Sequence, residues 1–160
     1  MRTASSMARK AAARRSERTD QRAKLIPRET EAIDAARPGT VLVVDDDPSI
    51  LRSLRRLVSA SGFEVKTFGK PSELLASELP RFDACMVVDI DLPEMNGIEM
   101  CEVLKGSGRS LPTILITGRT DARTRSMAAQ SDAIAVLFKP FDEGPLLDAI
   151  ARALALSTRP

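Results

Sequence analysis

Three short runs of apolar, largely β-branched residues constrain the fold of this chain more than any other feature. They are Val41–Val44, Ala84–Val88 and Thr113–Ile116, and polar residues do not alternate through them. Runs of this kind are typical of parallel strands that are covered on both faces, because an exposed face would carry polar residues at every second position. The strands therefore need crossover segments between them.

The segments between these runs have the spacing and the end signals of helices. Asp47-Pro48 provides an N-cap followed by a proline at the first helical position, and Gly62 ends the helix that begins there. Further helices are predicted over 71–79, 96–104, 121–130 and 142–156, and shorter strands over 63–68 and 134–138. The predicted fold class is α/β, a doubly wound five-stranded parallel sheet of the flavodoxin-like kind.

The first 38 residues differ in composition from the rest of the chain. They carry 10 Lys and Arg against 5 Asp and Glu, whereas residues 39–160 carry 14 against 17. They lack a wide apolar face and end at Pro38-Gly39. We predict a basic, disordered extension over 1–38 and one folded domain over 39–160. Nucleic acid is not expected as a partner, because basic arms are more often solvated tails.

The sequence predicts a cytoplasmic protein without a membrane partner. No apolar run approaches the roughly 20 residues of a membrane span, and the basic start has no apolar core of a secretory signal. Cys85 and Cys101 lie inside apolar runs, which favours reduced, partly buried thiols over a disulfide framework or a metal cluster.

Polar residues follow the carboxyl ends of four predicted strands. They are Asp45-Asp46-Asp47, Asp89 with Asp91, Thr117-Gly118 and Lys139-Pro140. The carboxyl ends of parallel strands meet at one edge of the sheet, where such folds bind ligands. Clustered carboxylates repel one another unless a cation neutralises them, and an all-oxygen set suits Mg²⁺. The sequence therefore predicts a magnesium site at this edge.

Four motifs stand in order along the chain: VLVVDDDP, VVDIDLPEMNG, LITG and LFKPF. In this order and spacing the chain from Thr40 to about Ser157 resembles the receiver domain of two-component response regulators. With the segment GFEVKTF, it is most similar to the branch that often precedes a helix-turn-helix output domain. Because the chain ends at Pro160, the expectation is a single-domain receiver.

The resemblance implies which residues hold the phosphoryl group and the metal ion. Asp89 matches the phosphoacceptor aspartate, and the main-chain carbonyl of Asp91 matches a metal ligand. Asp45 and Asp46 match the acidic pair that binds Mg²⁺. Because three aspartates stand in a row, it is ambiguous which two of them match this pair. We take the first two, since Asp47 is explained as a helix cap.

The resemblance also assigns the residues that contact the phosphoryl group, and here the chain departs from the family. Thr117 matches the switch hydroxyl, and Lys139 matches the lysine whose ammonium pairs with the phosphoryl group. The bond from Lys139 to Pro140 is usually cis in the family. Val136 stands where an aromatic residue is usual, so we expect no aromatic rotamer flip as the readout. The segment 130–132 replaces the common Gly-Ala before the last strand.

The implied function is phosphorylation-dependent signalling in a two-component phosphorelay. Asp89 would accept a phosphoryl group from a partner phosphohistidine, and the changed surface would act on a downstream protein or relay the group onward. The expected donor is a sensor histidine kinase or a histidine phosphotransfer protein, since this chain contains no histidine. We do not expect a conventional enzyme, because transfer and dephosphorylation are self-catalysed.

Two alternatives remain open beside this interpretation. The first is a docking module of the same fold that is never phosphorylated, against which the complete residue set argues. The second is a small phosphohydrolase that uses aspartate and Mg²⁺. Such an enzyme needs a second catalytic acid shortly after its nucleophile, and Asp91 lies at that spacing after Asp89, but the expected loop and cap segment are missing. Under the signalling interpretation, Asp91 and Arg119 should face each other across the mouth of the site.

Overall fold

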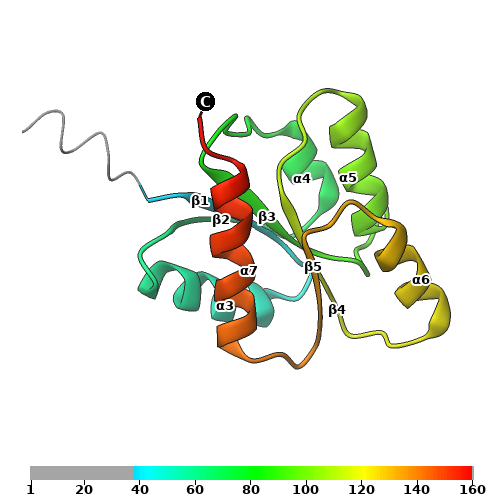
Figure 1. Cartoon of the computed structure of the whole chain (residues 1–160). Coiled ribbons are helices and arrows are strands. Elements are labelled where there is room, and N and C mark those ends of the chain that lie inside the picture. Colours follow the sequence, from blue (N-terminus) through cyan, green and yellow to red (C-terminus); the bar gives the residue numbers. More distant parts are fainter. Residues whose placement is uncertain (1–37, 160) are drawn as a thin grey trace, which may run out of the picture. The chain divides into compact units, whose positions relative to one another are not determined.

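The structure, a computed structural model, describes residues 38–159. Within this range five strands alternate with five helices (Figure 1). The strands are β1 (Thr40–Val44), β2 (Glu64–Phe68), β3 (Ala84–Asp89), β4 (Thr113–Thr117) and β5 (Ala135–Phe138). The helices are α3 (Pro48–Ala60), α4 (Pro71–Ala76), α5 (Gly97–Gly106), α6 (Ala122–Gln130) and α7 (Glu143–Leu156). The predicted fold class is confirmed. Residues 1–37 of the predicted extension lie outside the part of the chain that the structure describes.

The sheet is parallel throughout and has the strand order β2-β1-β3-β4-β5. After β1 the chain forms β2 on one side, and it then returns to the other side of β1 to form β3. The strand order therefore reverses between β1 and β3. An open parallel sheet binds its ligands beside such a reversal, at the carboxyl ends of the strands. The fold thus places the candidate site where β1 and β3 end.

Each buried strand supplies side chains to two separate core layers. In β1, Val41 and Val43 pack with residues of α3 and α7, whereas Leu42 and Val44 pack with residues of α4, α5 and α6. Figure 1 shows the same two groups of helices on the two faces of the sheet. Because both faces are buried, none of these strand positions tolerates an exposed polar side chain, which explains the uninterrupted apolar runs.

Local side-chain hydrogen bonds fix where the helices begin. The Asp47 carboxylate accepts a hydrogen bond of 2.8 Å from the backbone N–H of Ser49 at the start of α3. Asp121 caps α6 in the same way, through the backbone N–H of Thr124 at 3.0 Å. Gly62, which follows α3, has a φ of 92°, a backbone conformation that favours glycine. The predicted N-cap at Asp47 and the predicted helix end at Gly62 are confirmed, and the cap at Asp121 is added by the structure.

One predicted helix is too long, and a distant side chain explains the difference. Helix α4 was expected to reach Leu79 but ends at Ala76. The Arg109 guanidinium donates hydrogen bonds to the carbonyl oxygens of Leu75 at 2.9 Å and Ser77 at 2.6 Å. Those oxygens would accept backbone hydrogen bonds if the helix continued, so Arg109 takes the place of a further turn.

Candidate functional site

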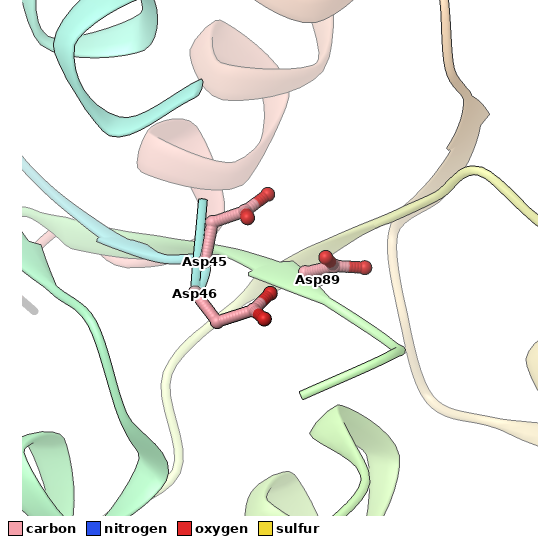
Figure 2. A group of neighbouring side chains, drawn as sticks. All are labelled: Asp45, Asp46 and Asp89. Atoms are coloured by element: carbon pink, nitrogen blue, oxygen red, sulfur yellow. The ribbon is translucent and has the colours of Figure 1, made fainter. Parts of the chain in front are cut away.

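The residues predicted from the strand ends meet at the carboxyl edge of the sheet. Asp45 directly follows β1, and Asp89 is the last residue of β3. Figure 2 shows the carboxylates of Asp45 and Asp46 next to that of Asp89. One carboxylate oxygen from each of these three residues lies within 4.8 Å of the others. Two chain segments separated by more than 40 residues therefore form one acidic group.

The Lys139 ammonium joins two of these carboxylates. Its Nζ donates to Asp45 Oδ2 at 2.8 Å and to Asp89 Oδ2 at 3.1 Å. Lys139 follows β5 at the far side of the sheet, so its long side chain reaches back over the end of β4. Both carboxylates are buried, and a buried charge is tolerated where it is paired and hydrogen-bonded.

Backbone donors orient the remaining oxygens of the two buried carboxylates. Asp45 Oδ1 accepts from the N–H of Asp47 at 2.9 Å, and Asp89 Oδ1 accepts from the N–H of Asp91 at 3.1 Å. In both cases the donor lies two residues later, in the loop that leaves the strand. These bonds hold the carboxylates of Asp45 and Asp89 each in one orientation.

The charges of the site do not balance. Burial raises the pKa of Asp89 above its ordinary range, and the Asp45 carboxylate adds to this, although the Asp91 N–H and the Lys139 ammonium oppose it. Burial by itself lowers the pKa of Lys139, but its hydrogen bonds to Asp45 and Asp89 outweigh burial, and the pKa is raised. Three carboxylates thus face one ammonium.

This excess of negative charge and the all-oxygen donor set fit a divalent cation such as Mg²⁺. The residues that would hold it are Asp45, Asp46 and Asp89, whose oxygens are close enough to share one ion. Asp47, the third member of the aspartate run, is instead engaged as the cap of α3. The role of the Asp91 carbonyl as a metal ligand stays a prediction.

Helix α5 begins in close contact with the end of β3. The N–H of Gly97 donates to the carbonyl of Ile90 at 3.0 Å, and a Cβ on Gly97 would lie 2.1 Å from the carbonyl oxygen of Asp89. Only glycine permits this approach. The sequence showed Asn96-Gly97 as a helix start, and the structure adds that Gly97 sets the distance between α5 and Asp89.

The buried Thr117 hydroxyl lies at the mouth of the site and is already engaged. It donates to Asp91 Oδ2 at 2.9 Å and accepts from the N–H of Arg119 at 3.0 Å. Arg119 Nη1 lies 3.6 Å from Asp91 Oδ1, so the predicted facing pair is confirmed. The sequence missed that Asp91 also binds Thr117, and that Arg119 Nε pairs with Asp121 Oδ2 at 3.2 Å.

The last strand and the loop after it match two further expectations. The Lys139–Pro140 bond is cis, as the resemblance implied, and Val136 is a half-buried core residue. Both cysteines are free; burial raises the pKa of Cys85 to about 12 and that of Cys101 to about 11. In the part of the chain from 38 to 159, no helix has the length and apolar character needed to cross a bilayer.

Curated proteins with similar sequences are response regulators. Nodulation protein W of Bradyrhizobium diazoefficiens is 37% identical over 120 residues, which cover 75% of this chain and 53% of the relative. Transcriptional regulatory protein TdiR of Thauera aromatica is 31% identical over 127 residues, covering 79% and 56%. The chain thus spans about half the length of these relatives. A transcriptional regulator among them agrees with the expected branch of the family.

Solved structures and a family model give the same result. The structure of response regulator StyR has 40% sequence identity and a TM-score of 0.66, covering 76% of this chain and 61% of that one. A CheY-like receiver domain protein from Methanospirillum hungatei has 28% identity and a TM-score of 0.66, covering 75% and 96%. Residues 41–151 match the response regulator receiver domain. The chain therefore belongs to the receiver domain family of two-component response regulators.

Proposed function

We propose that this protein signals by reversible phosphorylation of Asp89 in a two-component phosphorelay. The observation that carries the proposal is the position of the Asp89 carboxylate, which is held at the end of β3 between the Lys139 ammonium and the Asp45–Asp46 pair. Membership of the receiver family supports the same role. The donor would be a phosphohistidine on a sensor histidine kinase or on a histidine phosphotransfer protein.

The proposed transfer is a displacement at phosphorus. A carboxylate oxygen of Asp89 forms a bond to phosphorus, the bond from phosphorus to the donor's imidazole nitrogen breaks, and the imidazole leaves with the electron pair. Lys139 offsets the negative charge of the incoming group, and the N–H of Asp91 keeps the nucleophile oriented. When bound, Mg²⁺ supplies further positive charge to the phosphoryl oxygens.

Thr117 connects this chemistry to a change of surface. Its hydroxyl is held by Asp91 before phosphorylation and would turn to the phosphoryl group afterwards. That exchange releases Asp91 and Arg119 and rearranges the loop after β4, which serves in place of the aromatic flip that Val136 rules out. A downstream protein would recognise the rearranged surface, or the group would pass to another histidine. Because the chain acts on itself, we do not class it as a conventional enzyme, and we place it in the cytoplasm.

Intact mass after incubation with acetyl phosphate and Mg²⁺ tests this proposal. The wild type should gain one phosphoryl group, Asp89→Asn should gain none, and chelation of Mg²⁺ should prevent the gain. Asp91→Asn is the matched control; it keeps the Asp91 main chain and should still be phosphorylated. Equal labelling of wild type and Asp89→Asn would overturn the assignment, and a wild type that never gains mass would favour a docking module.

A further inference from the structure

A cavity of about 310 Å³ lies away from the phosphorylation site, near the amino ends of β4 and β5. Its walls come from one face of α5, from β3 and β4, and from the segments before β4 and between α6 and β5. Its volume falls within the range of about 300–1,000 Å³ that is usual for small-molecule sites. None of the residues that line it belongs to the phosphorylation site.

The lining of this cavity is mostly apolar, and the buried Thr113 hydroxyl in it is satisfied by the carbonyl oxygen of Leu111. Met86 and Leu115, both buried in the sheet, form part of its lining together with Ile98 of α5. The Cys101 thiol also lines it, and because burial raises its pKa to about 11, it is uncharged at neutral pH. A ligand that enters must therefore bring an apolar group to this part of the cavity.

Charged side chains occur only at the rim of this cavity. Lys105 of α5 donates a hydrogen bond to the Asp132 carboxylate, and both side chains are exposed. Glu102 stands three residues before Lys105 on the same helix and also acts on its charge. Asp132 alone binds this ammonium, and Glu102 adds a second negative charge close to it.

One side of the rim comes from the segment between α6 and β5. Ser131 and Asp132 of this segment both line the cavity. Asp132 already binds an alkylammonium group, that of Lys105, so the structure contains an example of the chemistry that the rim accepts. Because the rim carries an excess of negative charge, an incoming cation is favoured over an anion. An exposed ion pair is also weak enough to be exchanged for an equivalent one.

We propose that the cavity binds a small primary amine with an apolar body. The ammonium of the ligand replaces Lys105 at the Asp132 carboxylate, with Glu102 nearby, while the apolar body lies against Met86 and Leu115. Binding does not require Asp89, so this site is independent of the proposed phosphorylation.

Methyl NMR titration of the full chain with phenethylamine tests the proposal, with 3-phenylpropionate as a probe of similar body and opposite charge. Phenethylamine should shift the methyl signals of Met86 and Ile98 and leave that of Ile50, outside the cavity, unchanged. Asp132→Asn should weaken binding about fivefold, since one exposed charge pair is lost. Lys105→Ala should strengthen it, because the competing ammonium is gone. Asp89→Asn should bind as the wild type does.

Three results would overturn the proposal. They are equal shifts with the amine and the carboxylate, an affinity that Asp132→Asn leaves unchanged, and weaker binding by Lys105→Ala. Because Lys105 and Asp132 are exposed, neither substitution disturbs the core, and the thermal unfolding of each variant checks this directly.

Discussion

Two charge clusters lie at the carboxyl edge of the sheet and differ in exposure. We call Asp45, Asp89 and Lys139 the buried cluster, and Asp91, Arg119 and Asp121 the mouth cluster. Each pairs two carboxylates with one cation. The side chains of the buried cluster are 0%, 6% and 22% exposed, whereas those of the mouth cluster are 35%, 65% and 44% exposed. Burial therefore distinguishes clusters that have similar composition.

The difference decides what each cluster can do. In the buried cluster every charge depends on its partners, because water cannot replace a partner that is removed. In the mouth cluster solvent and salt screen the charges, so that the pairs contribute little and exchange readily. We infer that the buried cluster fixes the nucleophile and that the mouth cluster governs access to it.

The largest expected effect is that of Lys139→Ala on stability. This substitution leaves the carboxylates of Asp45 and Asp89 buried without their cation, which should lower the free energy of unfolding by about 3–5 kcal/mol. Added Mg²⁺ should restore more stability to this variant than to the wild type, since it neutralises the same charges. Thermal unfolding with and without Mg²⁺ measures both effects.

The matched control for that experiment is Lys105→Ala, which removes an exposed ion pair elsewhere on the surface. It should change the Tm little and should not alter the response to Mg²⁺. If the two lysine variants lose the same free energy of unfolding, the buried ion pairs contribute no more to stability than the exposed pair does.

Lys139→Ala should also lose the conformational response. The variant keeps Asp45, Asp46 and Asp89 and should still bind Mg²⁺, but it lacks the ammonium that recognises a phosphoryl group. Beryllofluoride, a phosphoryl mimic, should shift the backbone NMR signals around Thr117 in the wild type and leave them in place in the variant. Shifts of the same size in both proteins would show that the conformational response does not require Lys139.

A smaller effect concerns pH. The raised pKa of Asp89 means that the folded protein holds this proton more tightly than the unfolded chain does. Ionised Asp89 therefore lowers stability above its folded pKa, and this loss disappears as pH falls toward the unfolded value of about 3.9. Asp89→Asn should be more stable than the wild type at neutral pH, with a gain that fades in acid.

Chemical denaturation of both proteins across this pH range measures the gain. Asp132→Asn is the control, because its exposed carboxylate has a pKa that Lys105 lowers, and its removal should give no such gain. A stability difference between Asp89→Asn and wild type that stays constant with pH would contradict the link to ionisation.

The smallest effect belongs to the mouth cluster and concerns the lifetime of the phosphorylated state. We expect the ion pair between the Arg119 and Asp91 side chains to remain after Thr117 has turned to the phosphoryl group, where it would hinder a water molecule that approaches the acyl phosphate. Arg119→Ala should speed dephosphorylation several-fold, as expected for an exposed pair, and removing Asp91 as well should add little. Decay of the phosphorylated mass over time gives the rates, and independent, multiplicative effects would show that no gate exists.

The sequence predicts the buried cluster better than the mouth cluster, for a physical reason. Residues directly at strand ends are placed by the sheet itself, so Asp45, Asp89 and Lys139 could be expected to meet once the strands were known. The bond from Thr117 to Asp91 and the pair between Arg119 and Asp121 depend on loop conformation and rotamers, which short-range patterns do not determine. The early end of α4 likewise depends on Arg109, more than 30 residues later in the chain.

We propose that the buried cluster makes Asp89, and no other carboxylate at this edge of the sheet, the phosphoacceptor. Borohydride reduces an acyl phosphate to an alcohol with release of phosphate, and therefore marks the acceptor permanently. After phosphorylation with acetyl phosphate and Mg²⁺, reduction and peptide mass mapping should locate the mark at Asp89 alone. A mark at Asp45, Asp46 or Asp91, or its persistence in Asp89→Asn, would show that Asp89 is not the phosphoacceptor.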